Sequence, residues 1–201
     1  MTGEIRIYVE GGGDGSQTKA QLRQGFSALF RSLVDAARSQ RIRWALVVSG
    51  SRNNCFDDFC RALESHPNAF NVLLVDSESM VTKALDQHLL ERDQWAMPVS
   101  IDHCHLMVQT MEAWLVADRV ALARYYGEGF LDSAIPCNLD VEQIAKDTLE
   151  SALGRATRNT QRGRYRKIQH GAALLGLIEP RTVRNKARHC DRFFRTLENL
   201  M

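Results

Sequence analysis

The sequence predicts an α/β protein whose mainly parallel sheet is flanked by helices and followed by a helical C-terminal extension. Short apolar segments alternate with amphipathic segments of helical period over roughly the first 90 residues. Such alternation is typical of right-handed strand–helix–strand units. In addition, carboxylates follow two of the predicted strands directly, at the edge where open α/β sheets place their ligands.

The first predicted strand leads into a glycine-rich loop. Ile5, Ile7 and Val9 alternate with polar residues, and the strand ends at Glu10. Three glycines and Asp14 follow, and glycine allows a sharp turn and a close approach of the backbone to a ligand. The alternative interpretation is an ordinary strand-to-helix turn whose acidic side chains are solvated.

The remaining elements follow from the spacing of apolar residues along the chain. Continuous apolar runs predict further strands over residues 42–49, 70–75 and 105–110. Helical periodicity predicts helices over residues 18–39, 55–65, 80–90, 111–118, 139–153, 168–178 and 183–200. Asp140 is the expected N-cap of the helix 139–153, and residues 125–137 are expected to be irregular.

Length and composition are typical of one ordinary domain with a small addition. The chain has 201 residues, and we expect an α/β core over residues 1–118 with a mostly helical, basic region, 119–201, packed on it. Five scattered cysteines, an odd number, predict reduced thiols and a cytoplasmic protein. No apolar run has the length of a membrane helix, and no signal peptide is recognisable, so no membrane association is expected.

Charge is distributed unevenly along the chain. Residues 155–201 carry 12 Lys and Arg against 3 Asp and Glu, a net charge of +9, whereas the preceding residues carry 14 against 21, a net charge of −7. A basic region rich in arginine suits contacts with phosphates. The candidate nucleic-acid ligands are Arg52, in a predicted strand-end loop, and Arg164, Arg166, Lys167, Arg184, Arg188 and Arg192. Arg184, Arg188, Arg192 and Arg195 recur at helical spacing, so we expect them to form one basic stripe along the predicted helix 183–200. A solvated or partner-binding face is the alternative.

The acidic residues after the strands form the candidate site. Asp76 and Glu78 follow the third strand, and residues two apart in an extended chain point to the same side. If this strand neighbours the first, Glu10 and Asp14 join them. Two carboxylates about 5 Å apart repel by roughly 3 kcal/mol at an effective dielectric constant of 20. The cluster therefore predicts a bound Mg²⁺ or Mn²⁺, the ions that prefer oxygen ligands.

This arrangement resembles the Toprim domain, the catalytic α/β domain of topoisomerases, bacterial primases and overcoming-lysogenization-defect nucleases. The residues that carry the resemblance are Glu10, within VEGGGD, and the DxD-like Asp76-Ser77-Glu78. The chain departs from that pattern because a glutamate, which also binds Mg²⁺, replaces the last aspartate. The resemblance implies a Toprim-like, Rossmannoid core and a metal-dependent nuclease.

Most of the chain also looks like a bacterial family known as domain of unknown function 4276. The segments that carry this resemblance are YVEGGGDG, LLVDSE, QTMEAWLVAD and KIQHGAALLGLIEPRTVRNKARHCDRFFRTL. The resemblance implies a nuclease-like subunit that works with an ABC-type or AAA ATPase, in defence against foreign DNA. It also points to Glu112 as a fifth candidate acid, although a glutamate in the first turn of a helix is equally expected there.

The leading hypothesis is a Mg²⁺-dependent nuclease that cleaves phosphodiester bonds in DNA or RNA. Asp76 and Glu78 would hold metal, Glu10 would act as general acid or base or as a ligand, and Asp14 would support the metal site. Two alternatives stay open: a non-catalytic adaptor that binds an ATPase or nucleic acid, and a phosphotransferase or nucleotide-binding enzyme. A homo-oligomer is compatible with each of them.

Overall fold

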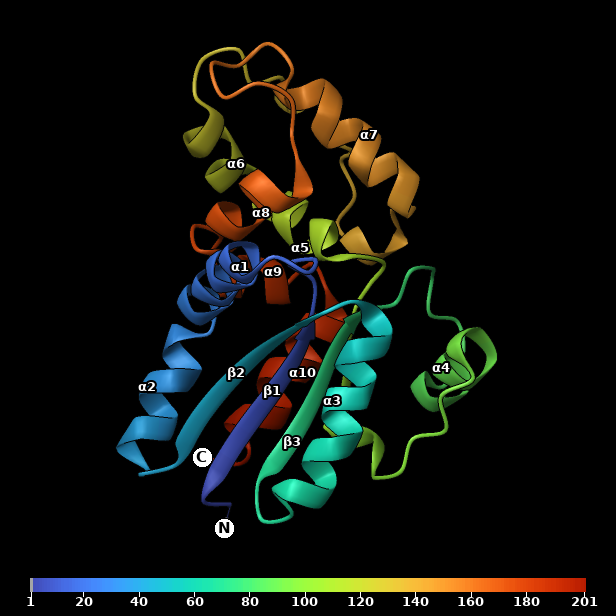
Figure 1. The fold of residues 1–201 in the computed structure, drawn as a ribbon. Coiled ribbons are helices and arrows are strands. Elements are labelled where there is room, and N and C mark those ends of the chain that lie inside the picture. Colours follow the sequence, from blue (N-terminus) through green and yellow to red (C-terminus); the bar gives the residue numbers. More distant parts are fainter. Residues whose placement is uncertain (1) are drawn as a thin grey trace.

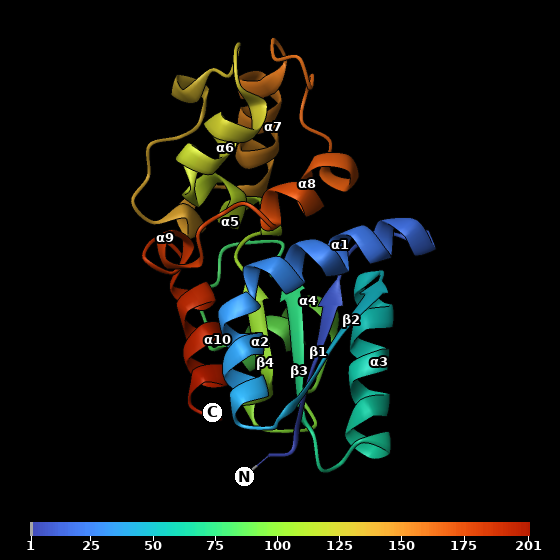
Figure 2. The same ribbon diagram turned by 90° about the vertical axis from the view of Figure 1, so that its left-hand side faces the viewer.

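The computed structural model describes residues 2–201 and confirms the predicted α/β class. Over this range four strands form one parallel sheet in the order β2–β1–β3–β4. Their bounds are β1 Glu4–Glu10, β2 Arg43–Gly50, β3 Phe70–Asp76 and β4 Cys104–Met107. All four run in the same direction, so their carboxyl ends meet at one edge (Figures 1 and 2).

One face of the sheet packs against three helices. These are α1 Ser16–Leu29, α2 Arg31–Ser39 and α10 Arg188–Glu198. Ile5, Ile7 and Val9 of β1 point into this layer, as the period of two predicts. Phe30 lies at its centre, with ring centroids 5.0 Å from Phe193 and 5.9 Å from the next phenylalanine of α10. The extreme C-terminal helix therefore completes the core of the N-terminal strands.

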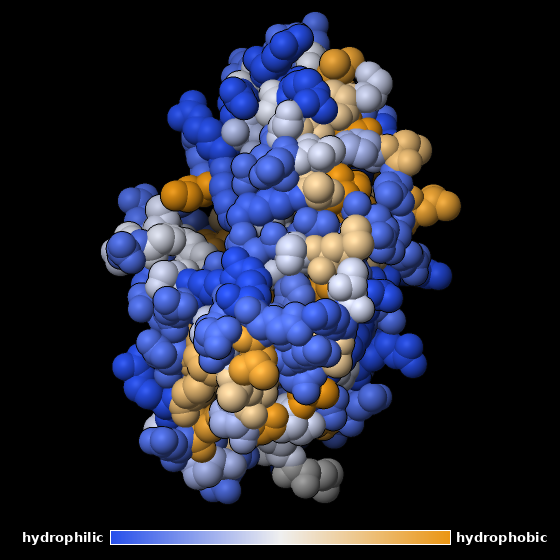
Figure 3. All heavy atoms as spheres, turned by 90° about the vertical axis from the view of Figure 1, so that its right-hand side faces the viewer, coloured by the Kyte–Doolittle hydropathy of each residue, from blue (hydrophilic) through white to orange (hydrophobic). Residues whose placement is uncertain are grey.

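The opposite face packs against α3 Arg52–Ser65, with α4 Leu85–Asp93 beside it. Tyr8 and Leu73 point into this layer together with Phe59. Figure 3 views the molecule from the side on which α4 lies, where the surface is mainly hydrophilic and apolar side chains gather in the lower half. Apolar residues of this layer that stay partly exposed include Phe56, Leu63, Met97, Val99 and Ile101.

A helical layer stands above the carboxyl edge of the sheet (Figure 2). Its helices are α5 Met111–Ala117, α6 Arg119–Tyr126, α7 Lys146–Thr157, α8 Lys167–Leu175 and α9 Pro180–Arg184. Helix α8 packs on α1, where a Cβ on Gly25 would lie 2.3 Å from the carbonyl oxygen of Ala172. Any larger residue at Gly25 would push the two helices apart. The strand ends are consequently enclosed between the sheet and this layer.

Several predicted helices are shorter or divided. The predicted helix 18–39 is two helices, because the chain turns at Phe30. Helix α1 lies along the carboxyl edge, whereas α2 runs beside the strands (Figure 2). The predicted helix 183–200 is also two, α9 and α10, with a break after Arg184. Apolar residues continue in helical phase through both breaks because those residues face the core, so the spacing could not reveal them.

Other boundaries differ from the predictions in the middle of the chain. Asp140 caps a short 3₁₀ turn, η3 Val141–Gln143, by accepting a hydrogen bond from the Glu142 N–H at 3.0 Å, and α7 begins only at Lys146. Strand β4 ends at Met107 rather than at residue 110. Helix α4 begins five residues later than predicted, and the predicted irregular segment 125–137 includes the end of α6. Among the described residues, no helix is both long and apolar enough to cross a membrane.

Candidate functional site

The carboxyl ends of β1 and β3 bring three acidic side chains together. These strands are parallel neighbours, with Val9 opposite Leu74. Glu10 Oε2 consequently accepts a hydrogen bond from the Asp76 N–H at 3.3 Å. One carboxylate oxygen of each of Glu10, Asp76 and Glu78 lies within 4.8 Å of the other two. The condition on which the predicted cluster depended, adjacency of the first and third strands, is therefore met.

Asp76 is the most enclosed of the three acids. It is 4% exposed, its Oδ1 accepts the Met111 N–H at 2.8 Å, and its Oδ2 lies 3.3 Å from Lys167 Nζ. Burial raises the pKa of Asp76 to about 7; Lys167 opposes this rise, whereas Glu10 and Glu112 add to it. An ionised Asp76 is therefore disfavoured relative to its state in the unfolded chain unless further positive charge is supplied.

Glu10 shares its charge with a fixed arginine. Burial raises the pKa of Glu10, against the opposing effect of Arg52, whose Nη1 lies 3.1 Å from Glu10 Oε2. The same guanidinium donates to both oxygens of Asp93 at 2.9 and 2.7 Å and lies 4.8 Å from the ring centroid of Trp95. Arg52 was predicted to contact nucleic acid. The structure places it behind the acids, engaged within the chain.

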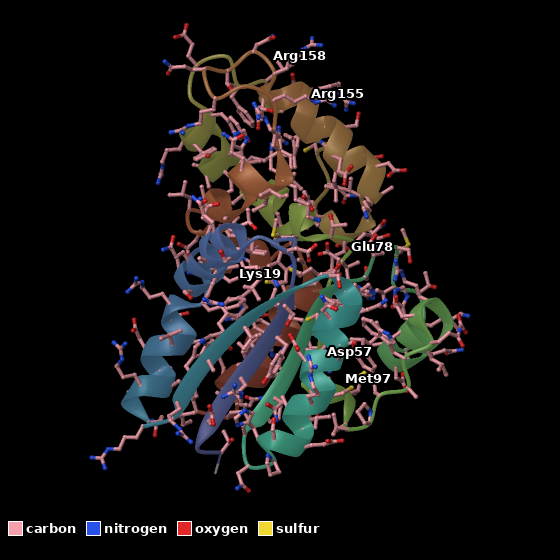
Figure 4. The ribbon with its side chains drawn as sticks, in the orientation of Figure 1. Lys19, Asp57, Glu78, Met97, Arg155 and Arg158 are labelled. Atoms are coloured by element: carbon pink, nitrogen blue, oxygen red, sulfur yellow. The ribbon has the colours of Figure 1, made fainter. Side chains whose placement is uncertain are left out.

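Glu78 enters the cluster through an unusual backbone conformation. Its φ is +64°, and its N–H donates to the Gln109 carbonyl at 2.7 Å. Its Oε2 pairs with Lys146, and Arg92 lies 4.0 Å away. Burial acts to raise the pKa of Glu78, but Lys146, Arg92 and Lys167 together outweigh it and the pKa is lowered. Figure 4 shows Glu78 at the upper edge of the sheet, below the helical layer.

Glu112 lies beside the cluster rather than within it. It is fully buried, its Oε1 accepts the Tyr165 hydroxyl at 2.9 Å, and its Oε2 lies 3.3 Å from Lys167 Nζ. Lys167 thus joins Glu112 to Asp76. Burial acts to lower the pKa of Lys167, but the two carboxylates outweigh it and raise the pKa. Asp14, predicted to support the metal, is exposed and stands outside the three-acid group.

The predicted basic stripe is divided between the surface and the interior. Arg184 is held by Asp191 at 2.8 Å and by Glu198, and it belongs to α9 rather than α10. Arg192 donates to the carbonyls of Cys104 and Ile101 at 2.8 and 2.9 Å. Both residues therefore bind other parts of the chain. The expectation of one continuous stripe of arginines along a single helix is wrong, because the chain breaks between α9 and α10.

Other basic residues remain at the surface. The Arg188 side chain is 69% exposed although its Nε lies 3.6 Å from Glu142 Oε2. Arg164 and Arg166 are exposed on the segment between α7 and α8, and Arg164 lies against Gly154 of α7. Arg155 and Arg158 extend from the top of the molecule (Figure 4), away from Glu78.

Residues that sequence reasoning missed are mainly the cations around the acids. Lys146 follows an apolar segment and Arg92 lies near the end of α4. No sequence pattern therefore indicated that either residue lies beside the acids. Tyr165 is a further residue of this kind, and its hydroxyl donates to Glu112. These contacts join residues more than 50 positions apart, and periodicity cannot reveal such pairs.

A cavity of about 250 Å³ adjoins the acid cluster. Glu10, Asp76 and Lys167 line one part of it, and the glycine-rich loop lines another. Gly11, Gly12 and Gly13 have φ values of +123°, +80° and +57°, and the Thr18 hydroxyl bonds the carbonyl of Gly12. The apolar lining consists of Leu22, Met107, Met111, Ile168 and Ala172. The loop thus forms a wall next to the carboxylates.

Glu10, Asp76 and Glu78 fit the requirements of a small divalent cation. Mg²⁺ prefers oxygen ligands at about 2.0–2.1 Å and usually keeps several waters, so one oxygen from each of three acids is a sufficient protein contribution. Burial, together with the charges of Glu10 and Glu112, raises the pKa of Asp76, and a bound cation would favour its ionised form. The donor set excludes the soft-metal sites that sulfur ligands would form.

The fold and the site define an α/β protein with a carboxylate cluster at the carboxyl edge of a parallel sheet. Residues 9–198 match the model of a family described as Domain of unknown function (DUF4276), and the chain therefore belongs to that family. The match begins one residue before Glu10 and includes every acid of the site. Neither the curated proteins nor the solved structures contain a match to this chain.

Proposed function

We propose that this protein is a Mg²⁺- or Mn²⁺-dependent nuclease subunit that hydrolyses phosphodiester bonds. The observation that carries the proposal is the meeting of Glu10, Asp76 and Glu78, with one oxygen of each within 4.8 Å of the others. The resemblance of VEGGGD and Asp76-Ser77-Glu78 to the Toprim nucleases supports the same chemistry.

Asp76, Glu78 and Glu10 would hold the ion. A bound divalent cation polarises a phosphoryl oxygen and lowers the pKa of an attacking water. Glu10, whose pKa is raised by burial, is suited to accept or donate a proton. Lys167 reaches the cavity from α8 and stabilises negative charge beside Asp76. Asp14 has no role in this proposal, because it lies outside the group.

Nucleic acid and an ATPase are the partners that we propose. The exposed arginines of the C-terminal half, among them Arg164, Arg166 and Arg188, are suited to phosphates. The ATPase partner, the role in bacterial defence and the cytoplasmic location follow from the family resemblance and the reduced cysteines. Copurification with tagged protein from its own host would test for the ATPase.

The first test is titration of Mg²⁺ and Mn²⁺ into the wild type by calorimetry, followed by a cleavage assay on plasmid, single-stranded DNA and RNA. Glu10→Gln and Asp76→Asn should abolish cleavage and leave the fold intact. Asp57→Asn, at an exposed carboxylate of α3, is the matched control and should retain wild-type binding and cleavage. Absence of metal binding to the wild type would overturn the proposal.

A non-catalytic adaptor is the second candidate, and one observation favours it. Each acid of the cluster already has a cation of the same chain: Arg52 for Glu10, Lys167 for Asp76 and Lys146 for Glu78. These pairs offset the repulsion without a metal ion. An adaptor would copurify with its ATPase, bind no Mg²⁺ in calorimetry, and leave nucleic acid intact both alone and in the complex.

A further inference from the structure

The cavity beside the acid cluster has two chemically different parts. Glu10, Asp76 and Lys167 form its polar part. The apolar part is larger than the charged one and contains two methionines, Met107 and Met111, which adapt to flat aromatic rings. A phosphate alone would leave the apolar part empty, and an apolar ligand alone would leave the charges unused. The cavity therefore suits a ligand that has both an aromatic body and a phosphate.

Ile168 closes the apolar part at the surface. Its side chain lines the cavity although the residue is 59% exposed. It lies next to Lys167 at the start of α8, so the two residues present an apolar and a charged group side by side. A ring that enters the cavity would cover Ile168 while its attached phosphate approached Lys167.

The size of the cavity limits what can enter. About 250 Å³ is below the usual volume of roughly 300–1,000 Å³ for drug-sized ligands. A base pair with both backbones cannot be enclosed in it. A paired base would have to leave its stack first, at a cost of a few kcal/mol. A single-stranded segment or a chain end has no such cost.

The glycine loop explains why this part of the cavity stays open. A Cβ on Gly11 would lie 2.8 Å from Leu22 Cδ2, and one on Gly50 would lie 2.9 Å from the carbonyl oxygen of Gly13. These glycines let the loop fold against β2 and α1. A Cβ on Gly13 meets no atom within 4 Å among the described residues. The wall thus has no side chain to fill the space beside Glu10.

We infer that this cavity binds the base of one unpaired nucleotide and thereby directs the adjoining phosphate to Glu10, Asp76 and Lys167. This inference rests on the proposed nuclease function and names its substrate class, a single strand or an unpaired strand end. The same chemistry could come from a free mononucleotide, and the experiment separates these two sources.

The test measures binding of fluorescent single strands of about eight nucleotides, of a blunt hairpin and of a nucleoside 5′-monophosphate, in Ca²⁺, which replaces the Mg²⁺ that would support cleavage. Gels check that the oligonucleotides stay intact. Ile168→Asn should weaken single-strand binding about tenfold, because the apolar contact between Ile168 and the base is lost. Ala172→Met, which fills the cavity, should have at least the same effect. Leu177→Asn is the matched control, since this residue is 49% exposed and lies just beyond α8 outside the cavity.

Preference for single strands over the hairpin, lost in Ile168→Asn and Ala172→Met but kept in Leu177→Asn, would support the inference. Tighter binding of the monophosphate than of the oligonucleotide, equal binding of the hairpin, or equal effects in all three variants would overturn it. Calorimetric titration of Mg²⁺ into Ala172→Met separates the two proposals. Metal binding without nucleotide binding by the wild type overturns only this inference, whereas absence of metal binding overturns the proposed function.

Discussion

Folding destabilises the ionised form of the Asp76 carboxyl group. Its pKa, raised to about 7 by burial and by Glu10 and Glu112, exceeds the value of about 3.9 in an unfolded chain. The folded state therefore binds the proton more tightly than the unfolded state. The stability that this proton provides is fully present below about pH 4 and is lost as the pH rises through about 7.

Asp76→Asn should consequently stabilise the metal-free protein at pH 8 and not at pH 4. We expect the free energy of unfolding to rise by about 2 kcal/mol at pH 8. This is less than the full pKa shift of Asp76 implies, because the variant also loses the ion pair with Lys167. Thermal unfolding in EDTA at several pH values measures it, with Asp57→Asn as the control. A difference in Tm between variant and wild type that does not grow between pH 4 and pH 8 would contradict the account.

Lys167 supplies the positive charge that two buried carboxylates need. Lys167→Gln removes this charge from Asp76 and Glu112. We expect the free energy of unfolding to fall by about 1–2 kcal/mol at pH 8. The loss is smaller than for a fully buried pair because the lysine side chain is 44% exposed. Added Mg²⁺ should restore part of the loss.

Lys83→Gln is the control for this variant, because Lys83 pairs with Glu91 at the surface. It should unfold like the wild type with and without Mg²⁺. Equal stability of Lys167→Gln and wild type in EDTA would show that the acids do not depend on this lysine.

At the scale of elements, the C-terminal helix α10 is part of the core rather than a basic appendage. Phe193 and Phe194 are buried against Phe30, and Arg192 binds two carbonyl oxygens of the segment at β4. Arginines that the sequence placed in one nucleic-acid-binding stripe thus have different tasks. The spacing of apolar residues shows only that a helix is amphipathic. The way its apolar face is buried decides which arginines remain exposed to solvent.

Arg192→Ala should therefore affect stability rather than nucleic-acid binding. Loss of its hydrogen bonds to the Cys104 and Ile101 carbonyls should cost about 1–3 kcal/mol. Arg195→Ala is the matched control, because its side chain is 72% exposed on the same helix. Urea unfolding compares the two. An unchanged midpoint for Arg192→Ala would mean that this arginine is available for a ligand.

At the scale of the whole molecule, the N-terminal α/β segment depends on the C-terminal half. Helix α10 covers the sheet face that also holds Ile5 and Ile7, and α8 packs on α1. A fragment of residues 1–118 would expose this apolar face to water. The cavity would lose Lys167 and Ile168 as well. Fold and candidate site are therefore built jointly by both halves of the chain.

We expect the fragment 1–118 to lack cooperative unfolding. Near-ultraviolet circular dichroism and urea titration of the fragment and the full chain provide the measurement. Mixing the fragment with a separately produced 119–201 segment is the control, since association should restore part of the signal. Cooperative unfolding of the isolated fragment, with a midpoint near that of the full chain, would contradict this expectation.

The amount that sequence predicts differs between the elements. Strands were located to within a few residues, because buried parallel strands are short apolar runs. Breaks at Phe30 and after Arg184 were missed, because apolar spacing continues through them. Glu10, Asp76 and Glu78 were found as candidates because they stand where strands end. The sequence did not predict which cations pair with these acids, because the cations lie on distant loops and helices.

The sequence by itself determined the α/β class, the positions of the strands and the acids that follow them, since these depend on local periodicity and on position within one element. Only the tertiary structure decided that β1 and β3 are neighbours, that Lys146, Lys167 and Arg52 neutralise the acids, and that α10 belongs to the core. The physical reason is that burial and charge pairing depend on which elements pack together, and local sequence patterns do not determine that packing.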